Sequence, residues 1–140
     1  MQAAAPLRTV HMAGAAVAAS AVAAGVWMLR TFDPNAAGNP FLPCVFHSLT
    51  GLYCPGCGAT RTLHALVHFD LPGALAMNPL LVLLLPLMPM LIAWSRGWRP
   101  AVIAPLMRIV ERPLVWLVLI PTYGIARNLP WAPFSWLAPG

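Results

Sequence analysis

The chain has 140 residues, of which 60% are hydrophobic and only 8% are charged. Soluble domains carry roughly 25% charged residues, so this composition excludes an ordinary water-soluble monomer and predicts an all-α integral membrane protein, built as a single domain over residues 1–140. The net charge of +5 comes from eight arginines that stand at the ends of apolar runs and form no basic stripe. This distribution argues against a nucleic-acid partner and favours membrane topology as the reason for the charge.

The first predicted span is the apolar run 10–29, which ends before Arg30. Twenty residues at about 1.5 Å each cover a hydrocarbon core of roughly 30 Å. The run is rich in alanine, and small residues let neighbouring helices approach closely. A cleaved signal peptide is the alternative, because Arg8 and His11 precede a stretch with many small residues. The apolar continuation from Trp27 favours a span that stays.

The second predicted span covers residues 79–95. Asn78 is a good N-cap, and Pro79 suits the first helical position, where a missing N–H costs nothing. Pro86 and Pro89 each remove a backbone hydrogen bond inside this run. The sequence therefore predicts a kink near the middle of the span.

The third predicted span covers residues 113–129 and is short. Its arginine, Arg127, must either reach an interface or find a partner inside the bundle. Residues 130–140 are rich in Trp and Pro, which is typical of a tail at the membrane interface. The chain thus predicts about three transmembrane helices.

The arginines also predict an orientation. With three spans, the N-terminus and the loop 96–112 share one side and hold five of the eight arginines. The positive-inside rule assigns that side to the cytoplasm. We therefore expect a multi-pass protein of the plasma (inner) membrane, with the cysteine-bearing segment 40–71 outside the cytoplasm.

That segment carries the residues most suited to metal binding or redox chemistry. Cys44, His47, Cys54 and Cys57 follow the spacing Cys-x2-His-x6-Cys-x2-Cys. Three sulfurs and one imidazole nitrogen would satisfy a tetrahedral zinc ion. The turn Cys-Pro-x-Cys-Gly also resembles the knuckles of zinc ribbons and rubredoxins, where glycine lets the backbone bend around the sulfurs. One hypothesis is therefore a zinc-binding site.

Other interpretations of the cysteines stay open. Cys54 and Cys57 form a C-x-x-C pair that, with Arg61 nearby, suits a membrane thiol–disulfide oxidoreductase. Gly58 and Thr60 indicate, however, that the helix begins after the second cysteine, whereas active dithiols place the first one at the helix start. A structural disulfide of Cys44 with either partner, or reduced and packed cysteines, are the remaining possibilities.

A short helix is predicted after the motif, over residues 58–70. It is too short to span, so it should lie in the interface or form a re-entrant segment. Arg61, His64 and His68 fall on one stripe at helical spacing. The stripe is interpreted as a polar face toward water or lipid headgroups; alternatively, it adds metal ligands or binds an anionic headgroup.

The rest of the chain offers no catalytic constellation. Its three acidic residues lie far apart, and it has neither a phosphate-binding glycine loop nor a Ser/His/Asp arrangement. We therefore expect a non-enzymatic structural or accessory subunit whose partners are membrane lipid and other membrane-protein subunits. The zinc-binding module and the thiol–disulfide oxidoreductase are the alternatives.

The motif also carries a family resemblance. The run Leu-Thr-Gly-Leu-Tyr-Cys-Pro-Gly-Cys-Gly-Ala-Thr-Arg at 49–61, followed by Asn-Pro-Leu at 78–80 and Arg-Asn at 127–128, resembles the bacterial membrane family catalogued as domain of unknown function 2752. The resemblance covers residues 40–130 and implies a compact membrane protein with this motif as its signature, without assigning metal or redox chemistry. The motif residues expected to be structural are Gly51, Pro55, Gly58, Thr60, Arg61, Asn78 and Pro79.

Overall fold

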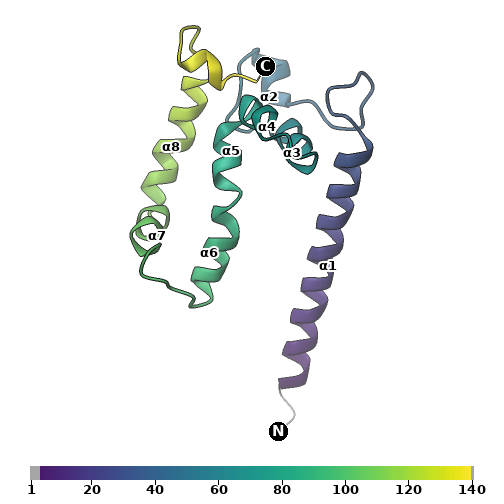
Figure 1. Cartoon of the computed structure of the whole chain (residues 1–140), viewed down its shortest axis with the longest axis vertical. Coiled ribbons are helices and arrows are strands. Elements are labelled where there is room, and N and C mark those ends of the chain that lie inside the picture. The colour runs from purple at the N-terminus through teal and green to yellow at the C-terminus, as the bar shows by residue number, and fades with distance from the viewer. Residues whose placement is uncertain (1–3, 140) are drawn as a thin grey trace. The chain divides into compact units, whose positions relative to one another are not determined.

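The computed structural model describes residues 4–139, arranged as two compact units that divide after Pro40 (Figure 1). Every regular element in this part of the chain is a helix, which confirms the all-α prediction. The side chains of Arg8 and His11, used above in the signal-peptide and orientation arguments, lie outside the described residues.

The first unit consists mainly of one long helix, α1 (Ala4–Thr31). Its segment Met12–Thr31 is long and apolar enough to cross a membrane by itself. The helix extends two residues beyond the predicted end at residue 29. Asp33 follows in a turn in which its Oδ1 accepts hydrogen bonds from both the backbone and the side chain of Asn35. This local pairing suits the chain reversal after a span.

The second unit contains the remaining helices. In chain order they are α2 (Val45–Thr50), α3 (Ala59–Val67), α4 (Leu71–Met77), α5 (Pro79–Leu84), α6 (Leu87–Ser95), α7 (Ala104–Val110), α8 (Pro113–Ala126) and the 3-10 turn η1 (Phe134–Leu137). Figure 1 shows α5–α6 and α8 as two elongated helical segments that are connected at one end through α7. Helices α2 to α4 and the C-terminal tail lie at the other end.

The segment predicted as the second span forms a broken helix, α5 and α6. Asn78 accepts a hydrogen bond from the N–H of Leu81 and Pro79 is the first helical residue, which confirms the predicted start. The helical hydrogen-bond pattern is interrupted around Leu85 and Pro86, where the sequence predicts a kink. The seventeen residues of 79–95 rise by about 25 Å, enough to cross most of a bilayer core.

Two sharp bends limit the number of straight spans. Helix α4 meets the segment Pro79–Ser95 at 117°, and α7 meets α8 at 72°. Only α1 is membrane-length alone, and the described chain reaches three spans if each bent pair counts as one. The prediction of about three membrane helices is confirmed on that count. Helix α8 ends at Ala126, short of the predicted 129, because residues 127–129 form a turn.

The segment after the motif forms a pair of short helices, where the sequence predicts only one. Helix α3 ends at Val67, and Phe69 has a left-handed φ of 62°, which no helix can continue through. The two helices pack through small side chains, since Thr62, Ala65 and Ala74 are buried. The Thr62 hydroxyl donates to the carbonyl of Ala74. This close contact helps to fix α3, whose first residue follows shortly after the Cys54–Cys57 turn.

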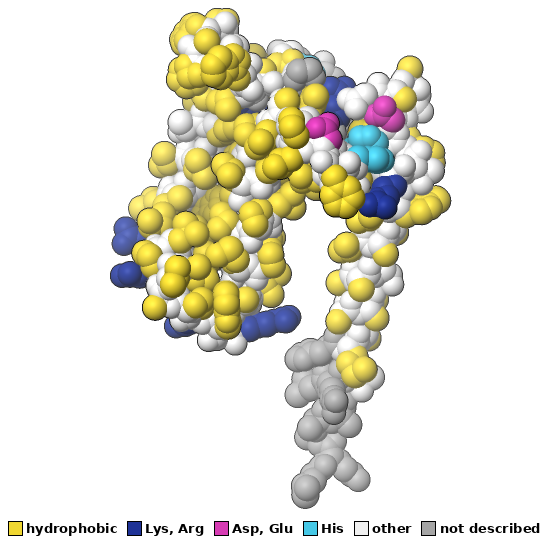
Figure 2. All heavy atoms as spheres, in the orientation of Figure 1, with side chains coloured by type: hydrophobic (Ala, Val, Ile, Leu, Met, Phe, Trp, Pro, Cys, Tyr) yellow, Lys and Arg dark blue, Asp and Glu magenta, His cyan; other side chains and the backbone are white. Residues whose placement is uncertain are grey.

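The surface of the second unit is mostly apolar. Figure 2 shows hydrophobic side chains over α5 to α8 and basic side chains gathered near α7. The exposed basic residues of this end are Arg96, Arg99, Arg108 and Arg112. Large exposed side chains such as Leu83, Ile92, Leu117 and Val118 suit contact with lipid and not with water. The unit therefore has a basic end and, opposite to it, a cysteine-bearing end.

Gly58 generates a prediction on stability. Its φ is +80°, and a Cβ there would lie 2.8 Å from the carbonyl oxygen of Met77. Gly58→Ala should therefore suffer both backbone strain and a steric clash. We expect the free energy of unfolding in detergent micelles to fall by at least ~2 kcal/mol, read from denaturant or thermal melts.

Gly51→Ala is the matched control. Gly51 has a similar φ of +71° but open space around its Cβ position. It should show the backbone strain alone, about 1–2 kcal/mol. Equal losses for the two variants would show that the contact of Gly58 with α4 contributes nothing.

Candidate functional site

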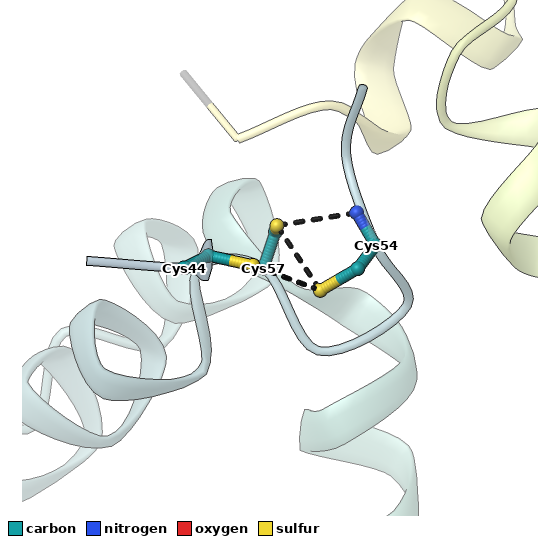
Figure 3. Close-up of side chains that lie close together, drawn as sticks. All are labelled: Cys44, Cys54 and Cys57. Carbon is teal, nitrogen blue, oxygen red and sulfur yellow. Dashed lines mark hydrogen bonds between the residues drawn. The ribbon is translucent and has the colours of Figure 1, made fainter. Parts of the chain in front are cut away.

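The three cysteine sulfurs converge on one point (Figure 3). The Cys54 sulfur lies 3.4 Å from that of Cys44 and 3.1 Å from that of Cys57. All three sulfurs lie within 4.8 Å of one another, and all three cysteines are free thiols. These separations are too long for a disulfide, whose S–S length is about 2.05 Å. The structure thus forms a three-thiol cluster from two segments of chain.

The turn from Cys54 to Cys57 gives the cluster its shape. The N–H of Cys57 donates to the carbonyl of Cys54, and the N–H of Cys54 donates to the Cys57 sulfur at 3.2 Å. Gly58 then takes the left-handed conformation, and α3 begins at Ala59. The helix therefore starts after the second cysteine, as the sequence predicts.

Arg127 holds this turn from the end of α8. Its side chain is 1% exposed. Nε donates to the carbonyl of Leu137 at 2.9 Å, and one terminal nitrogen donates to those of Cys54 and Pro55 at 3.1 and 3.2 Å. The other terminal nitrogen donates to Met77 at 3.0 Å. One guanidinium thus joins the cysteine turn, the end of α4 and the C-terminal tail.

Asn78 contacts the same turn from the start of α5. Its amide nitrogen donates to the carbonyls of Pro55 and Cys57 at 3.0 and 3.2 Å. Its amide oxygen accepts from the Leu81 N–H and from the Tyr123 hydroxyl. A residue that caps a span therefore also fixes the cysteine turn.

Asn128 completes the attachment. Its amide pairs with the backbone of Tyr53, accepting from the N–H at 2.8 Å and donating to the carbonyl at 2.9 Å. One turn earlier, a Cβ on Gly124 would lie 3.0 Å from the Pro55 ring, so α8 approaches the turn very closely. We name the three side chains Arg127, Asn78 and Asn128 the turn clamp.

His47, the fourth predicted metal ligand, does not join the cluster. Its ring stacks on Tyr53 with centroids 4.7 Å apart and planes 9° from parallel. Its Nδ1 lies 3.2 Å from the carbonyl oxygen of Leu52. The group of metal-binding donors found among the described residues contains the three cysteines without it.

The predicted polar stripe lies on α3. Arg61 is exposed, and the rings of His64 and His68 are 4.4 Å apart. Neither imidazole is part of the three-donor group in the described chain. Thr60 is half-buried, and the buried polar residue of this helix is its neighbour Thr62.

Sequence reasoning singled out Asn78 but missed the roles of Arg127 and Asn128. A signal for them was present, because an arginine within a predicted apolar span marks a place where charge is needed. What the sequence does not contain is their distance in space from Cys54, from which Arg127 is separated by 73 residues.

Two of the thiols have opposite electrostatic environments. The backbone N–H of His47, in the first turn of α2, lowers the pKa of Cys44, helped by the neighbouring thiols. Burial raises the pKa of Cys57 to about 12, with the Cys54 and Cys44 thiols adding to the rise. In the absence of a cation, Cys44 is thus the readier thiolate and Cys57 stays protonated.

One known family matches the part of the chain that contains the motif. Residues 44–92 match the family described as "Protein of unknown function (DUF2752)", which confirms the predicted resemblance over this part of the chain. The matched region contains all three cysteines and Asn78, whereas Arg127 and Asn128 lie beyond it. No curated protein and no solved structure matches the chain significantly.

The turn clamp predicts a large effect of Asn78→Ala. The change leaves the carbonyls of Pro55 and Cys57 without their donor and removes the cap of α5. We expect at least ~2 kcal/mol of lost stability in detergent, measured by thermal or denaturant unfolding. Asn35→Ala, at an exposed turn, should cost less than ~0.5 kcal/mol. A small effect at Asn78 would contradict the clamp.

The thiol environments predict an order of alkylation in reduced, metal-free protein. At pH 8 Cys44 should react with iodoacetamide well before Cys57, because only the thiolate reacts. Raising the pH to about 10 should still leave Cys57 largely unmodified, since its raised pKa lies above that. Peptide mass spectrometry measures both rates. In denaturant the difference should vanish; equal rates in the folded protein would contradict the assignment.

Proposed function

We propose that this chain is a small multi-pass membrane protein that binds one thiophilic metal ion, zinc being the best fit, through Cys44, Cys54 and Cys57. The observation that carries the proposal is the convergence of three free sulfurs, from two separate segments, within 4.8 Å. Thiolates are ligands for zinc and other soft ions.

The sulfur separations are near those that a metal requires. Around a tetrahedral zinc with bonds of about 2.3 Å, two sulfurs stand about 3.8 Å apart. The observed sulfur contacts of Cys54 are 3.4 and 3.1 Å, so they must lengthen by about 0.4 and 0.7 Å, which small side-chain rotations supply. Cys44 and Cys54 are only half-buried, which gives an ion a path to the cluster.

Three protein ligands leave one coordination position for water or an outside donor. Metal sites with an open position exchange ligands more readily than closed four-ligand sites. His47 is the nearest candidate in sequence, but its stacking on Tyr53 favours an outside donor. A site of this type suits an accessory protein that holds an ion for a membrane partner, in keeping with a non-enzymatic role.

The placement of charge supports an extracytoplasmic site. The exposed arginines between α6 and α8 gather at the end of the second unit opposite the cysteines (Figure 2). With that basic end in the cytoplasm, the cluster faces the other side of the plasma membrane.

A thiol–disulfide oxidoreductase is the weaker candidate. The 3.1 Å contact of Cys54 and Cys57 is the observation that favours it. Against it stand the pKa of Cys57 near 12 and the start of α3 after both cysteines, which removes the usual activation by a helix N-terminus.

Metal analysis tests the proposal. Full-length protein purified in detergent under reducing conditions and loaded with Zn²⁺ should retain one equivalent per chain after desalting, and Cys54→Ser should lose it. His47→Ala is the matched control and should keep the metal, because that ring is not in the cluster.

Folded wild-type protein with reduced thiols that retains no Zn²⁺ or Cd²⁺ would overturn the proposal. A Cys54–Cys57 disulfide in protein isolated from membranes, found by mass spectrometry after blocking free thiols, would favour the oxidoreductase. Loss of metal in His47→Ala would show that the site uses four ligands and rearranges on binding.

A further inference from the structure

We infer that Arg127 provides the counter-charge of a negatively charged complex of three thiolates with a divalent ion, and so acts as a positioning residue for the metal. This inference rests on the proposed metal site. It goes further in stating the charge of the bound complex and the residue that balances it.

The starting observation is a buried cation without an acidic partner. Arg127 is 1% exposed, and none of its contacts in the described chain is with a carboxylate. Asp70 instead caps α4 through the N–H of Gly73, and Glu111 is exposed near α7. Burying a charge is costly unless another charge compensates it.

The carbonyl partners of Arg127 accept its hydrogen bonds but do not neutralise its charge. No buried side-chain nitrogen or oxygen in the described residues lacks a hydrogen-bond partner. Four carbonyls and the Tyr123 ring, 5.2 Å from the guanidinium carbon, supply only partial negative charge. The C-terminal end of a helix such as α4 contributes at most about half an elementary charge. A positive excess therefore remains at this place.

The cysteine cluster is a group able to become negative that shares a turn with the carbonyl to which Arg127 donates. Arg127 donates directly to the carbonyl of Cys54, whose sulfur is the one in contact with both others. The positive charge and the central sulfur thus belong to the same short turn.

Metal binding changes that balance. A divalent ion that takes three thiols releases three protons to solvent and leaves a complex with a charge of −1. Together with the guanidinium, the buried group is then neutral. A monovalent ion on the same three thiolates would leave −2 and a surplus negative charge, so charge balance favours a divalent ion.

The decisive comparison is between Arg127→Gln and Arg127→Lys. Both changes destroy the pattern of donors to four carbonyls, but only lysine keeps the charge. We expect Gln to weaken Zn²⁺ binding by roughly 10–100-fold and Lys to stay within about threefold of the wild type. Competition with a chromophoric chelator measures the affinity of the full-length protein in detergent, and thermal melts measure its folding separately.

Equal losses in the two variants, or affinities that simply follow thermal stability, would overturn the inference and assign Arg127 a structural role alone. Arg96→Gln is the control for net charge, since Arg96 is exposed at the basic end; the Zn²⁺ affinity of this variant should be unchanged. If Arg127→Gln does not fold, Arg127→Lys decides alone, and a tenfold or larger loss there overturns the inference.

A double-mutant cycle tests the charge balance of the metal complex directly. Cys44→His replaces a thiolate by a neutral ligand and so removes one negative charge from the complex. It should weaken Zn²⁺ binding less in the Arg127→Gln background than in the wild type, because the doubly substituted site is again neutral. Equal effects in the two backgrounds would overturn the inference. Wild-type protein that binds no metal would overturn the proposed function itself.

Discussion

The hydrogen bonds of Arg127 are the constraint on which the second unit depends. A guanidinium with almost no exposed surface must find an acceptor for its donors, and in this unit the acceptors are backbone carbonyls of the cysteine turn, of α4 and of the C-terminal tail. These segments come from distant parts of the sequence. The guanidinium of Arg127 contacts all of these segments, and the two clamp asparagines add further hydrogen bonds to the cysteine turn and to Tyr53.

Residue patterns were sufficient for the elements that depend on local chemistry. The apolar runs predicted the long helix α1 and the second span, and Asn78 with Pro79 predicted where that span begins. The glycine after the second cysteine predicted the start of α3. In each case the cause lies within a few residues along the chain: a cap, a missing N–H, or a length matched to the bilayer. The spacing of the cysteines left a metal site, a disulfide, a redox pair and packed thiols open, and in the structure the three sulfurs lie close together.

The remainder depends on contacts that local patterns do not contain. The helix predicted over 58–70 ends early, because the chain turns at Phe69 and α4 packs on α3 through small side chains; a sharp bend before Pro79 follows. His47 has a spacing suitable for a metal ligand, but its ring stacks on Tyr53 and lies outside the sulfur cluster. Tyr53 is in turn held by a hydrogen bond to Asn128, which is distant in sequence. The role of Arg127 could be anticipated only as a need for a partner, without the identity of that partner.

The close approach of α8 to the cysteine turn has a mechanical consequence. Gly124 lies against the Pro55 ring and Arg127 donates to the carbonyl of Cys54, so the end of α8 is in direct contact with the cysteine turn. Fourteen helical residues rise only about 21 Å, less than a hydrocarbon core of roughly 30 Å, so a bilayer that α8 crosses must become thinner around it. If α8 crosses the bilayer, a change in bilayer thickness acts on the cysteine turn through the end of α8.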